Sequence, residues 1–495
     1  MLSGVIKQIG FPSDVAGRAA VLLLAAVWLW SVYRAASQSI TADEAYTYQL
    51  YLERDWRAVF RDYDANNHVL YTLLTRLVIP RLGRSEFALR FVSIGFGALF
   101  FVAVYQLCRL LFRASWLFLP AVITVACNPY VLDFVCAARG YGPGVALVLA
   151  GLYALLRYGQ DGSCRWLGAA GWSFGLAIGM NLTMVFPVAA AQLVFGIHWW
   201  RDGREFLHRT VLPCLAVAFV INALPLSHAQ RDNFYVGART LAGTVETLST
   251  FSLRHHLTPL EELQNRAVDL ALWLAPSWTA AAVGLVLWRG GWAHRLLACT
   301  WVVLLIFIVL AHIGLQLPYP EFRTGLYLIP LTTLVLLCGV DARVHPFIRA
   351  VLGAPQAVVG LLFVAQLGAT TFAEWPFDAG TRRVAERLEM LGPCLRRGRS
   401  ERLRLGCSWV LDKSLSYYRS RWRMEWIAPI TRAPVDGDWD IYVLLPEDAG
   451  IMEKRNLEVL YEDPVSHVKL AVPRSAAAWL RPSAESEANP GGVAR

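Results

Sequence analysis

Long apolar runs recur along the chain between residues 18 and 372, separated by polar segments. A helix needs about 20 apolar residues to cross a hydrocarbon core of about 30 Å. The pattern therefore predicts about eleven membrane-spanning helices, and the run 18–36 is expected to remain as an uncleaved first span. The predicted spans are 18–36, 89–111, 115–133, 142–158, 165–180, 182–199, 209–228, 267–288, 295–315, 324–342 and 349–372. At Asn181-Leu182-Thr183 the pattern fits either one bent helix or two helices.

The amino-acid composition supports the prediction of a membrane protein. The 495 residues are 56% hydrophobic and 17% charged, and the mean hydropathy is +0.43. A soluble chain of this length would carry more charge. We predict a polytopic α-helical transmembrane domain over 1–372, a small α/β domain over 373–481 and a disordered tail over 482–495.

The positive charges predict an orientation in the membrane. Alternate short loops on one side of the predicted spans each carry at least two Arg or Lys residues. The residues are Lys7, Arg18, Arg109, Arg113, Arg157, Arg165, Arg201, Arg204, Arg209, Arg289, Arg295, Arg343 and Arg349. Such loops stay cytoplasmic. This places the N-terminus inside, and 37–88, 229–266 and 373–495 outside a bacterial inner membrane. The positive charges behind the net charge of +9 are thus explained by membrane orientation, and we predict no nucleic-acid partner.

Two polar regions are predicted to be structured. In 37–88, Ala45–Phe60 and His68–Leu82 fit amphipathic helices at the membrane interface. The tail combines an amphipathic helix at Arg382–Leu391 with β-like runs at 403–411, 441–445 and 468–472. Cys394 and Cys407 in this tail could form a disulfide, and spacing alone leaves that open.

The sharpest candidate chemistry is the acidic pair Asp43-Glu44, directly after the first span. An aspartate near an apolar surface can have its pKa raised into the range of a general base. The alternative is structural, because Asp is a favoured helix N-cap and Asp43 could cap a helix that begins at Glu44.

Three further polar groups fall on the same predicted outer side. Asn67-His68 opens the second interfacial helix, where turn and capping chemistry is the alternative interpretation. Arg139 and Tyr141 lie at the outer end of the fourth span, and Arg323 and Tyr327 lie at the start of the tenth. Arginines there oppose the charge bias and can bind a phosphate, although interfacial snorkelling is the alternative.

Several common catalytic motifs are missing from the sequence. No glycine-rich nucleotide loop or HExxH pair occurs. An activated donor must therefore reach the outer face without a nucleotide site, and a lipid-phosphate sugar meets that requirement because it is already in the membrane.

The order of these motifs resembles the GT-C superfamily, most closely the bacterial branch related to protein O-mannosyltransferases and the lipid A aminoarabinose transferase. The resemblance spans 18–372. It comprises Asp43-Glu44-Ala45, His68 at the head of a helix, Ala138-Arg139-Gly140-Tyr141, and Arg323 before a span that contains Pro330. The sequence departs from the family pattern at Val69-Leu70, where the family has Pro-Pro, at Ala137, and at Asn181-Leu182-Thr183-Met184, where a Lys or Arg is expected.

The resemblance implies a GT-C fold and a glycosyltransferase that moves a sugar from a polyprenyl phosphate to an acceptor with inversion. Asp43 would be the base and Glu44 its support. Arg139 and Arg323 would hold the donor phosphate, with His68, Asn67, Tyr141 and Tyr327 in the substrate site. The acceptor would be a lipid, a cell-envelope glycan or a protein hydroxyl. Two arginines can neutralise the leaving phosphate, so no cofactor or obligatory metal is expected.

Two other function classes remain open from the sequence. A transporter or flippase would place charged residues within the spans, and few occur there, chiefly Asp133, Asp269 and His312. A non-catalytic scaffold whose outer tail binds a partner would not need Asp43.

Overall fold

The computed structural model divides the chain into two compact units, 1–37 with 54–369 and 38–53 with 370–495. It describes residues 14–61, 64–112, 116–230, 233, 236–256, 259, 261–343, 345–396 and 400–477. The predicted disordered tail, 482–495, and Lys7 and Arg113 of the charge pattern lie outside the described residues.

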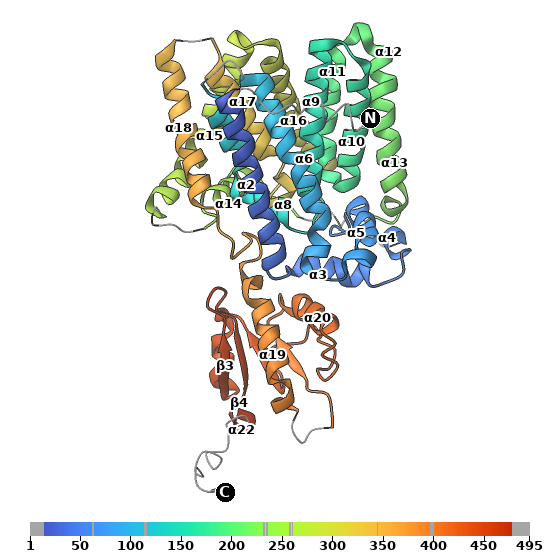
Figure 1. Cartoon of the computed structure of the whole chain (residues 1–495), viewed down its shortest axis with the longest axis vertical. Helices are drawn as coiled ribbons and strands as arrows, with labels where there is room; N and C mark the ends of the chain where they lie inside the picture. Colours follow the sequence, from blue (N-terminus) through green and yellow to red (C-terminus); the bar gives the residue numbers. More distant parts are fainter. Residues whose placement is uncertain are drawn as a thin grey trace, which may run out of the picture. The chain divides into compact units, whose positions relative to one another are not determined.

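The first unit is helical (Figure 1). Its α-helices are α2 (Val15–Ser37), α4 (Ala58–Arg61), α5 (Val69–Leu82), α6 (Glu86–Phe112), α7 (Phe118–Ala126), α8 (Pro129–Cys136), α9 (Tyr141–Asp161), α10 (Cys164–Met180), α11 (Val185–His198), α12 (Gly203–Phe206), α13 (Leu212–Leu226), α14 (Leu241–Leu253), α15 (Glu261–Arg289), α16 (Trp292–Leu315), α17 (Leu328–Asp341) and α18 (Pro346–Ala365). Short 3-10 or π turns are η2 (Leu182–Met184), η3 (Trp200–Asp202), η4 (Leu207–Val211) and η6 (Phe322–Gly325).

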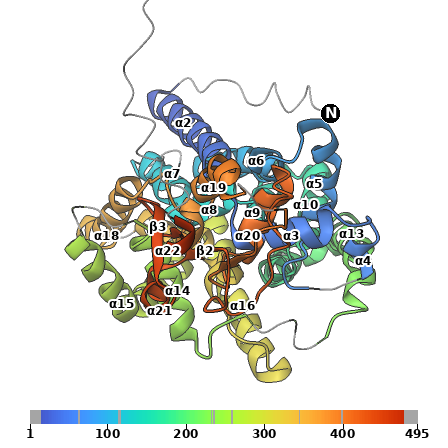
Figure 2. The ribbon, with the colours of Figure 1, turned by 90° about the horizontal axis from the view of Figure 1, so that it is seen from below.

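Among the long apolar helices of the described residues, α9 is the most buried. It packs against α6, α8, α10 and α11, and its neighbours surround it in the end-on view of Figure 2. Other helices expose large apolar side chains, among them Phe219 and Val220 of α13 and Trp273 of α15. Apolar surface of this kind on long helices is expected where lipid is the solvent. The chain is a multi-pass membrane protein.

The number of spans differs from the prediction. Within the described residues, seven helices are long and apolar enough to cross a membrane, or eight if α7 and α8 form one span bent by 58°. Leu182–His198 and α17 are shorter, so eleven crossings are not confirmed. The bend follows from the sequence, because Pro129 begins α8 and the Asn128 side chain accepts from the Val131 N–H.

Asn181 separates two helices rather than bending one. Its backbone is extended (φ −158°, ψ 129°), α10 ends at Met180, and η2 begins at Leu182.

The segment 37–88 also differs in part from the prediction. The helix expected at Ala45–Phe60 is interrupted between Leu52 and Ala58, whereas the one expected at His68–Leu82 forms as α5. Helix α14 was not predicted.

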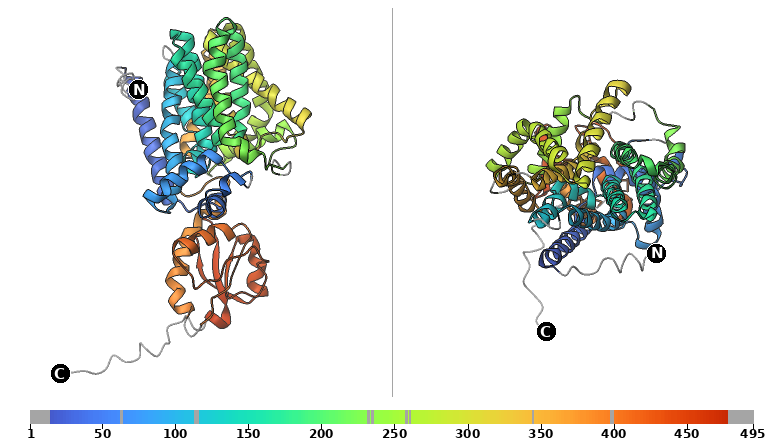
Figure 3. Two further views of the ribbon diagram at one scale, coloured as in Figure 1. Left: turned by 90° about the vertical axis from the view of Figure 1, so that its right-hand side faces the viewer. Right: turned by 90° about the horizontal axis from the view of Figure 1, so that it is seen from above.

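The second unit contains a four-stranded sheet in the order β1-β2-β4-β3. Its elements are α3 (Ala42–Thr47), η1 (Tyr48–Leu52), η7 (Pro376–Gly380), α19 (Thr381–Leu395), β1 (Leu405–Cys407), α20 (Asp412–Arg421), β2 (Ile441–Leu444), η8 (Pro446–Asp448), α21 (Ala449–Lys454), β3 (Leu457–Glu462), β4 (Lys469–Pro473) and α22 (Arg474–Ala477). Helices lie beside the strands (Figure 3).

The register of the sheet brings apolar residues of β2, β3 and β4 together. β1 runs parallel to β2, which pairs antiparallel with β4, and β4 pairs antiparallel with β3. Tyr442, Leu444, Leu457 and Ala471 pack together as a buried cluster. The three predicted β-like runs overlap β1, β2 and β4, and β3 was not predicted. Cys394 and Cys407 are both free, the first exposed and the second buried.

Candidate active site

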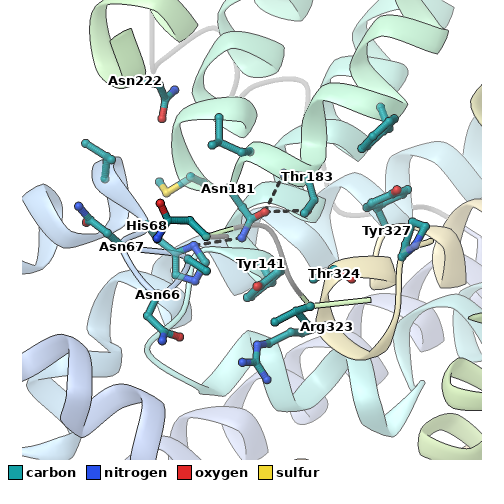
Figure 4. A pocket seen from close by; sticks show the side chains of 18 of the residues that line it. Asn66, Asn67, His68, Tyr141, Asn181, Thr183, Asn222, Arg323, Thr324 and Tyr327 are labelled. Carbon is teal, nitrogen blue, oxygen red and sulfur yellow. Dashed lines mark hydrogen bonds between the residues drawn. The ribbon is translucent and has the colours of Figure 1, made fainter. Parts of the chain in front are cut away.

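The first unit encloses a cavity of about 160 Å³. Its walls come from the loop before α5, the start of α9, the junction of α10 and η2, α13, and the segment around η6. The lining residues include Asn66, Asn67, His68, Tyr141, Asn181, Thr183, Asn222, Arg323, Thr324 and Tyr327, all of them labelled in Figure 4. Five predicted site residues thus line one cavity, namely Asn67, His68, Tyr141, Arg323 and Tyr327.

His68 is fixed on several sides. It is the N-cap residue of α5, but its side chain makes no capping hydrogen bond, so the capping interpretation does not hold for this ring. Instead its Nδ1 lies 3.0 Å from Asn181 Nδ2. The Tyr141 ring meets it edge-on at a centroid distance of 4.8 Å.

The charge state of His68 follows from its surroundings. The residue is 5% exposed, and burial lowers its pKa well below the ordinary value. The positive charges of Arg139 and Arg323 lower that pKa further. His68 is therefore a neutral imidazole at physiological pH.

Arg323 lies on the cavity wall, in the turn η6. The turn is closed by a reciprocal pair, in which the Glu321 N–H donates to Thr324 Oγ1 at 2.8 Å. Tyr327 follows it and is buried at the start of α17. The turn thus presents a guanidinium group and a phenol to the same cavity.

Arg139 lies behind the cavity wall. It is 0% exposed and does not line the cavity. Its Nη2 donates to Asn66 Oδ1 at 2.6 Å, and Asn66 does line the cavity. Arg139 therefore supports the cavity wall through Asn66, and its positive charge lies behind that residue.

Two glycines allow this wall to form. A Cβ on Gly140 would lie 1.9 Å from the Met180 carbonyl oxygen, and one on Gly142 would lie 2.1 Å from the Phe134 carbonyl oxygen. Any side chain would separate these backbones. The Ala138-Arg139-Gly140-Tyr141 element consequently packs directly against the end of α10.

Asp43 and Glu44 belong to α3, in the second unit. The N-cap of α3 is Thr41, whose hydroxyl accepts from the Glu44 N–H at 3.3 Å. Glu44 Oε2 accepts from the Thr41 N–H at 2.9 Å. This reciprocal capping box corrects the alternative in which Asp43 caps a helix that begins at Glu44. Glu44 has a structural role here, and Asp43 is the partly buried second residue of the helix.

Asp378 anchors α3 within the second unit. Its Oδ2 accepts from the Ala42 N–H at 2.6 Å, and its Oδ1 accepts from the hydroxyls of Ser414 and Thr381 at 2.6 and 3.2 Å. Burial raises the pKa of this carboxyl to about 8. The residue next to Asp43 is therefore held by a buried carboxyl from η7.

The same segment is held at further points. Ile40 N–H donates to Tyr418 Oη at 3.0 Å, Ser39 Oγ donates to the Ala379 carbonyl at 3.1 Å, and Gln49 donates to the Lys413 carbonyl at 2.9 Å. Residues 38–53 thus fold with the C-terminal region rather than with 54–88, their neighbours in sequence.

Two groups of residues were not among the predicted site residues. Asn181 and Thr183 were noted only as a departure from the family pattern. A buried network in the first unit was missed as well, in which Asp133 accepts from Arg34 Nη2 at 2.6 Å and lies 2.6 Å from His255 Nε2. The signal available for it was three ionisable residues in or next to apolar runs.

Metal ligation is a separate question. No group of three or more His, Cys, Asp or Glu side chains stands at metal-binding spacing within the part of the chain that the structure describes. The expectation that no metal is required stays a prediction.

Comparison with known proteins gives one family match. The family "Dolichyl-phosphate-mannose-protein mannosyltransferase" matches residues 66–227. That segment carries Asn67, His68, Arg139 and Tyr141, while Asp43, Glu44, Arg323 and Tyr327 lie outside it. A search of curated proteins finds no match.

Solved structures show only a distant likeness. ArnT from Cupriavidus metallidurans bound to undecaprenyl phosphate aligns at 12% identity over 91% of this chain and 97% of that one, with a TM-score of 0.48. Its apo state aligns at 12% identity over 92% of this chain and 98% of that one, with a TM-score of 0.49. Arabinosyltransferase EmbB from Mycobacterium smegmatis aligns at 11% identity over 81% of this chain and 42% of that one, with a TM-score of 0.41. The match over 66–227 confirms that the chain resembles the membrane glycosyltransferases of the GT-C superfamily, as its motifs predict.

Proposed function

We propose that the chain is a glycosyltransferase that moves a sugar from a polyprenyl-phosphate donor to an acceptor hydroxyl. The observation that carries the proposal is the cavity of the first unit, where His68 and Tyr141 of the family-matched segment meet Arg323 from far along the chain. A lipid, a cell-envelope glycan and a protein hydroxyl are all acceptors of the required chemistry.

The cavity chemistry suits a glycosyl phosphate. Amide and hydroxyl side chains around the wall can bind sugar hydroxyls. Arg323 offers a planar guanidinium that can bind two phosphate oxygens at once. Arg139 adds a second positive charge that is fixed on Asn66. Two fixed cations would stabilise the negative charge of the departing polyprenyl phosphate.

Asp43 is the proposed general base. It would accept the proton of the acceptor hydroxyl as that oxygen bonds to the anomeric carbon. The bond from the anomeric carbon to the phosphate oxygen breaks in the same step, and its electron pair leaves on the polyprenyl phosphate. One displacement of this kind inverts the anomeric configuration. Glu44 assists by capping α3, which fixes the backbone beside Asp43.

The proposed reaction takes place at the outer face of the bacterial cytoplasmic membrane. This orientation rests on the Arg and Lys residues of the alternate short loops. It would place the N-terminus inside and the C-terminal α/β region outside. Two guanidinium groups can neutralise the leaving group, so we expect turnover without an added metal.

A transporter or flippase is the competing function. The buried Arg34–Asp133–His255 network is the feature that favours it, because ionisable groups within membrane segments often mark transport paths. These three groups are paired with one another, as a structural network would be.

Proteoliposomes separate these functions. The purified chain would be supplied with undecaprenyl phosphates bearing different radiolabelled sugars, together with lipid, glycan and peptide acceptors, with and without EDTA. We expect labelled acceptor and released undecaprenyl phosphate in amounts unaffected by EDTA. Movement of label across the bilayer without any product would support transport and contradict the proposal.

A further inference from the structure

The orientation of the Asn181 amide is set by the backbone. Asn181 Oδ1 accepts from the Thr183 N–H at 2.9 Å and from Thr183 Oγ1 at 2.6 Å. A backbone N–H can only donate, so the oxygen must face Thr183 and the NH₂ group must face His68. Figure 4 shows this arrangement, with Asn181 between the other two side chains.

The amide orientation selects one form of the His68 ring. Asn181 Nδ2 is a donor, and it lies 3.0 Å from His68 Nδ1, so Nδ1 must accept. A neutral imidazole that accepts at Nδ1 carries its proton on Nε2. Burial and the charges of Arg139 and Arg323 keep the ring neutral by lowering its pKa.

The resulting Nε2–H group donates no hydrogen bond within the described residues. His68 Nε2 is buried and has no hydrogen-bond partner among them, although the residue lines the cavity. A buried donor without a partner is costly. The ring cannot turn easily to find one, because the Tyr141 ring packs against it in a T-shaped contact and Gly140 lies against its Cβ.

We propose that Asn181, held by Thr183, is a positioning residue that keeps His68 as the neutral Nε2–H tautomer, which donates a hydrogen bond to an oxygen of the lipid-linked glycosyl phosphate. This inference rests on the proposed function, because it takes the donor class from there. It assigns His68 a hydrogen-bonding role in which no proton is transferred. Asn181 acts only through His68.

The tautomer can be measured without any turnover. Full-length protein labelled with ¹⁵N-histidine would be placed in lipid nanodiscs, and His68→Gln would identify the signals of His68. We expect Nδ1 to be unprotonated and Nε2 to be protonated from pH 5.5 to 8. A wild-type signal from protonated Nδ1 would overturn the proposal.

Two variants test the role of Asn181. In Asn181→Asp the carboxylate cannot donate, so Nδ1 should become protonated. The matched control is Asn222→Asp, since Asn222 lines the same cavity but donates to the Ala218 carbonyl; its His68 signals should stay unchanged. Unchanged His68 signals in Asn181→Asp would overturn the proposal. Thr183→Val keeps the backbone N–H and is the milder second variant, with a partial shift expected.

Ligand addition tests what Nε2–H binds. Undecaprenyl phosphate alone and its glycosylated form would be added separately to the wild type. A shift of the Nε2 signal with both indicates a phosphate oxygen, and a shift with only the glycosylated form indicates a sugar oxygen. Either result supports the proposal, and no shift with either lipid overturns it.

Turnover gives a further measurement once sugar transfer is established. Asn181→Asp should lower kcat/KM by about 10- to 100-fold, as expected for losing a hydrogen bond to a charged or buried group. Thr183→Val should lower it less, in proportion to its shift in tautomer. Absence of transfer by the wild type would remove the proposed function and leave the spectroscopic tests intact.

Discussion

The cavity of the first unit and helix α3 of the second are held in place by different means. The cavity wall depends on side-chain bonds between residues far apart in sequence, such as His68 with Asn181 and Arg139 with Asn66. Helix α3 begins with a local capping box and is then fastened by one buried carboxyl, Asp378. The predicted site residues are thus divided between a cavity built by long-range contacts and a helix whose beginning is locally encoded.

The largest effect on stability is expected in the first unit, at Arg34. Arg34→Met removes a partner of the buried Asp133, and breaking a buried ion pair costs about 3–5 kcal/mol. Thermal unfolding in detergent would show a large fall in apparent Tm. Arg18→Met, an exposed change in the same helix, is the control. Equal Tm values for the two variants would mean that the network does not hold this unit together.

Arg323 tests the chemistry of the cavity. Arg323→Gln removes the guanidinium of the cavity wall, and loss of one preorganised charge-stabilising group costs about 10²–10³-fold in rate. The measurement is kcat/KM with the lipid-linked sugar. Arg201→Gln, an exposed arginine outside the cavity, should leave the rate unchanged. A rate for Arg323→Gln within twofold of wild type would contradict donor binding at this wall.

Asp378 tests the anchoring of α3 through pH. Its pKa is raised to about 8 by burial, so the folded state holds a proton that the unfolded state has lost above its own pKa near 4. Stability from this group is present at low pH and is lost as pH rises towards 8, by at most about 1.4 kcal/mol per pH unit. Apparent Tm should therefore fall between pH 6 and 8.

The matched variants sharpen this test. Asp378→Asn cannot ionise, so its Tm should fall less steeply over the same range. Asp438→Asn, at an exposed position of the same unit, should keep the wild-type slope. Parallel slopes for wild type and Asp378→Asn would show that Asp378 does not ionise in this range.

The difference between the two regions also explains what could be predicted. Apolar runs identify the membrane helices, because lipid imposes length and composition on each helix separately. The Thr41–Glu44 capping box is also local, and its spacing could have been read from the sequence. The break at Asn181 was visible as a weak point, although its form was left open.

The rest depends on distant neighbours. No local signal links Asn181 with His68, or Asp378 with Ala42, because each pair is brought together only by folding. Arg139 illustrates the limit, since its motif does not reveal the hydrogen bond that it donates to Asn66. The attachment of residues 38–53 to the C-terminal region depends on Asp378, Tyr418 and Lys413, which lie more than 300 positions away along the chain.

The central claim is that Asp43 is the general base of sugar transfer, and one comparison tests it most directly. Sugar transfer from a polyprenyl-phosphate sugar would be measured for wild type, Asp43→Asn and Asp55→Asn, whose carboxylate is exposed. The account predicts a fall of about 10²–10⁴-fold for Asp43→Asn, with undecaprenyl phosphate binding retained and Asp55→Asn at the wild-type rate. Equal turnover for wild type and Asp43→Asn would contradict it.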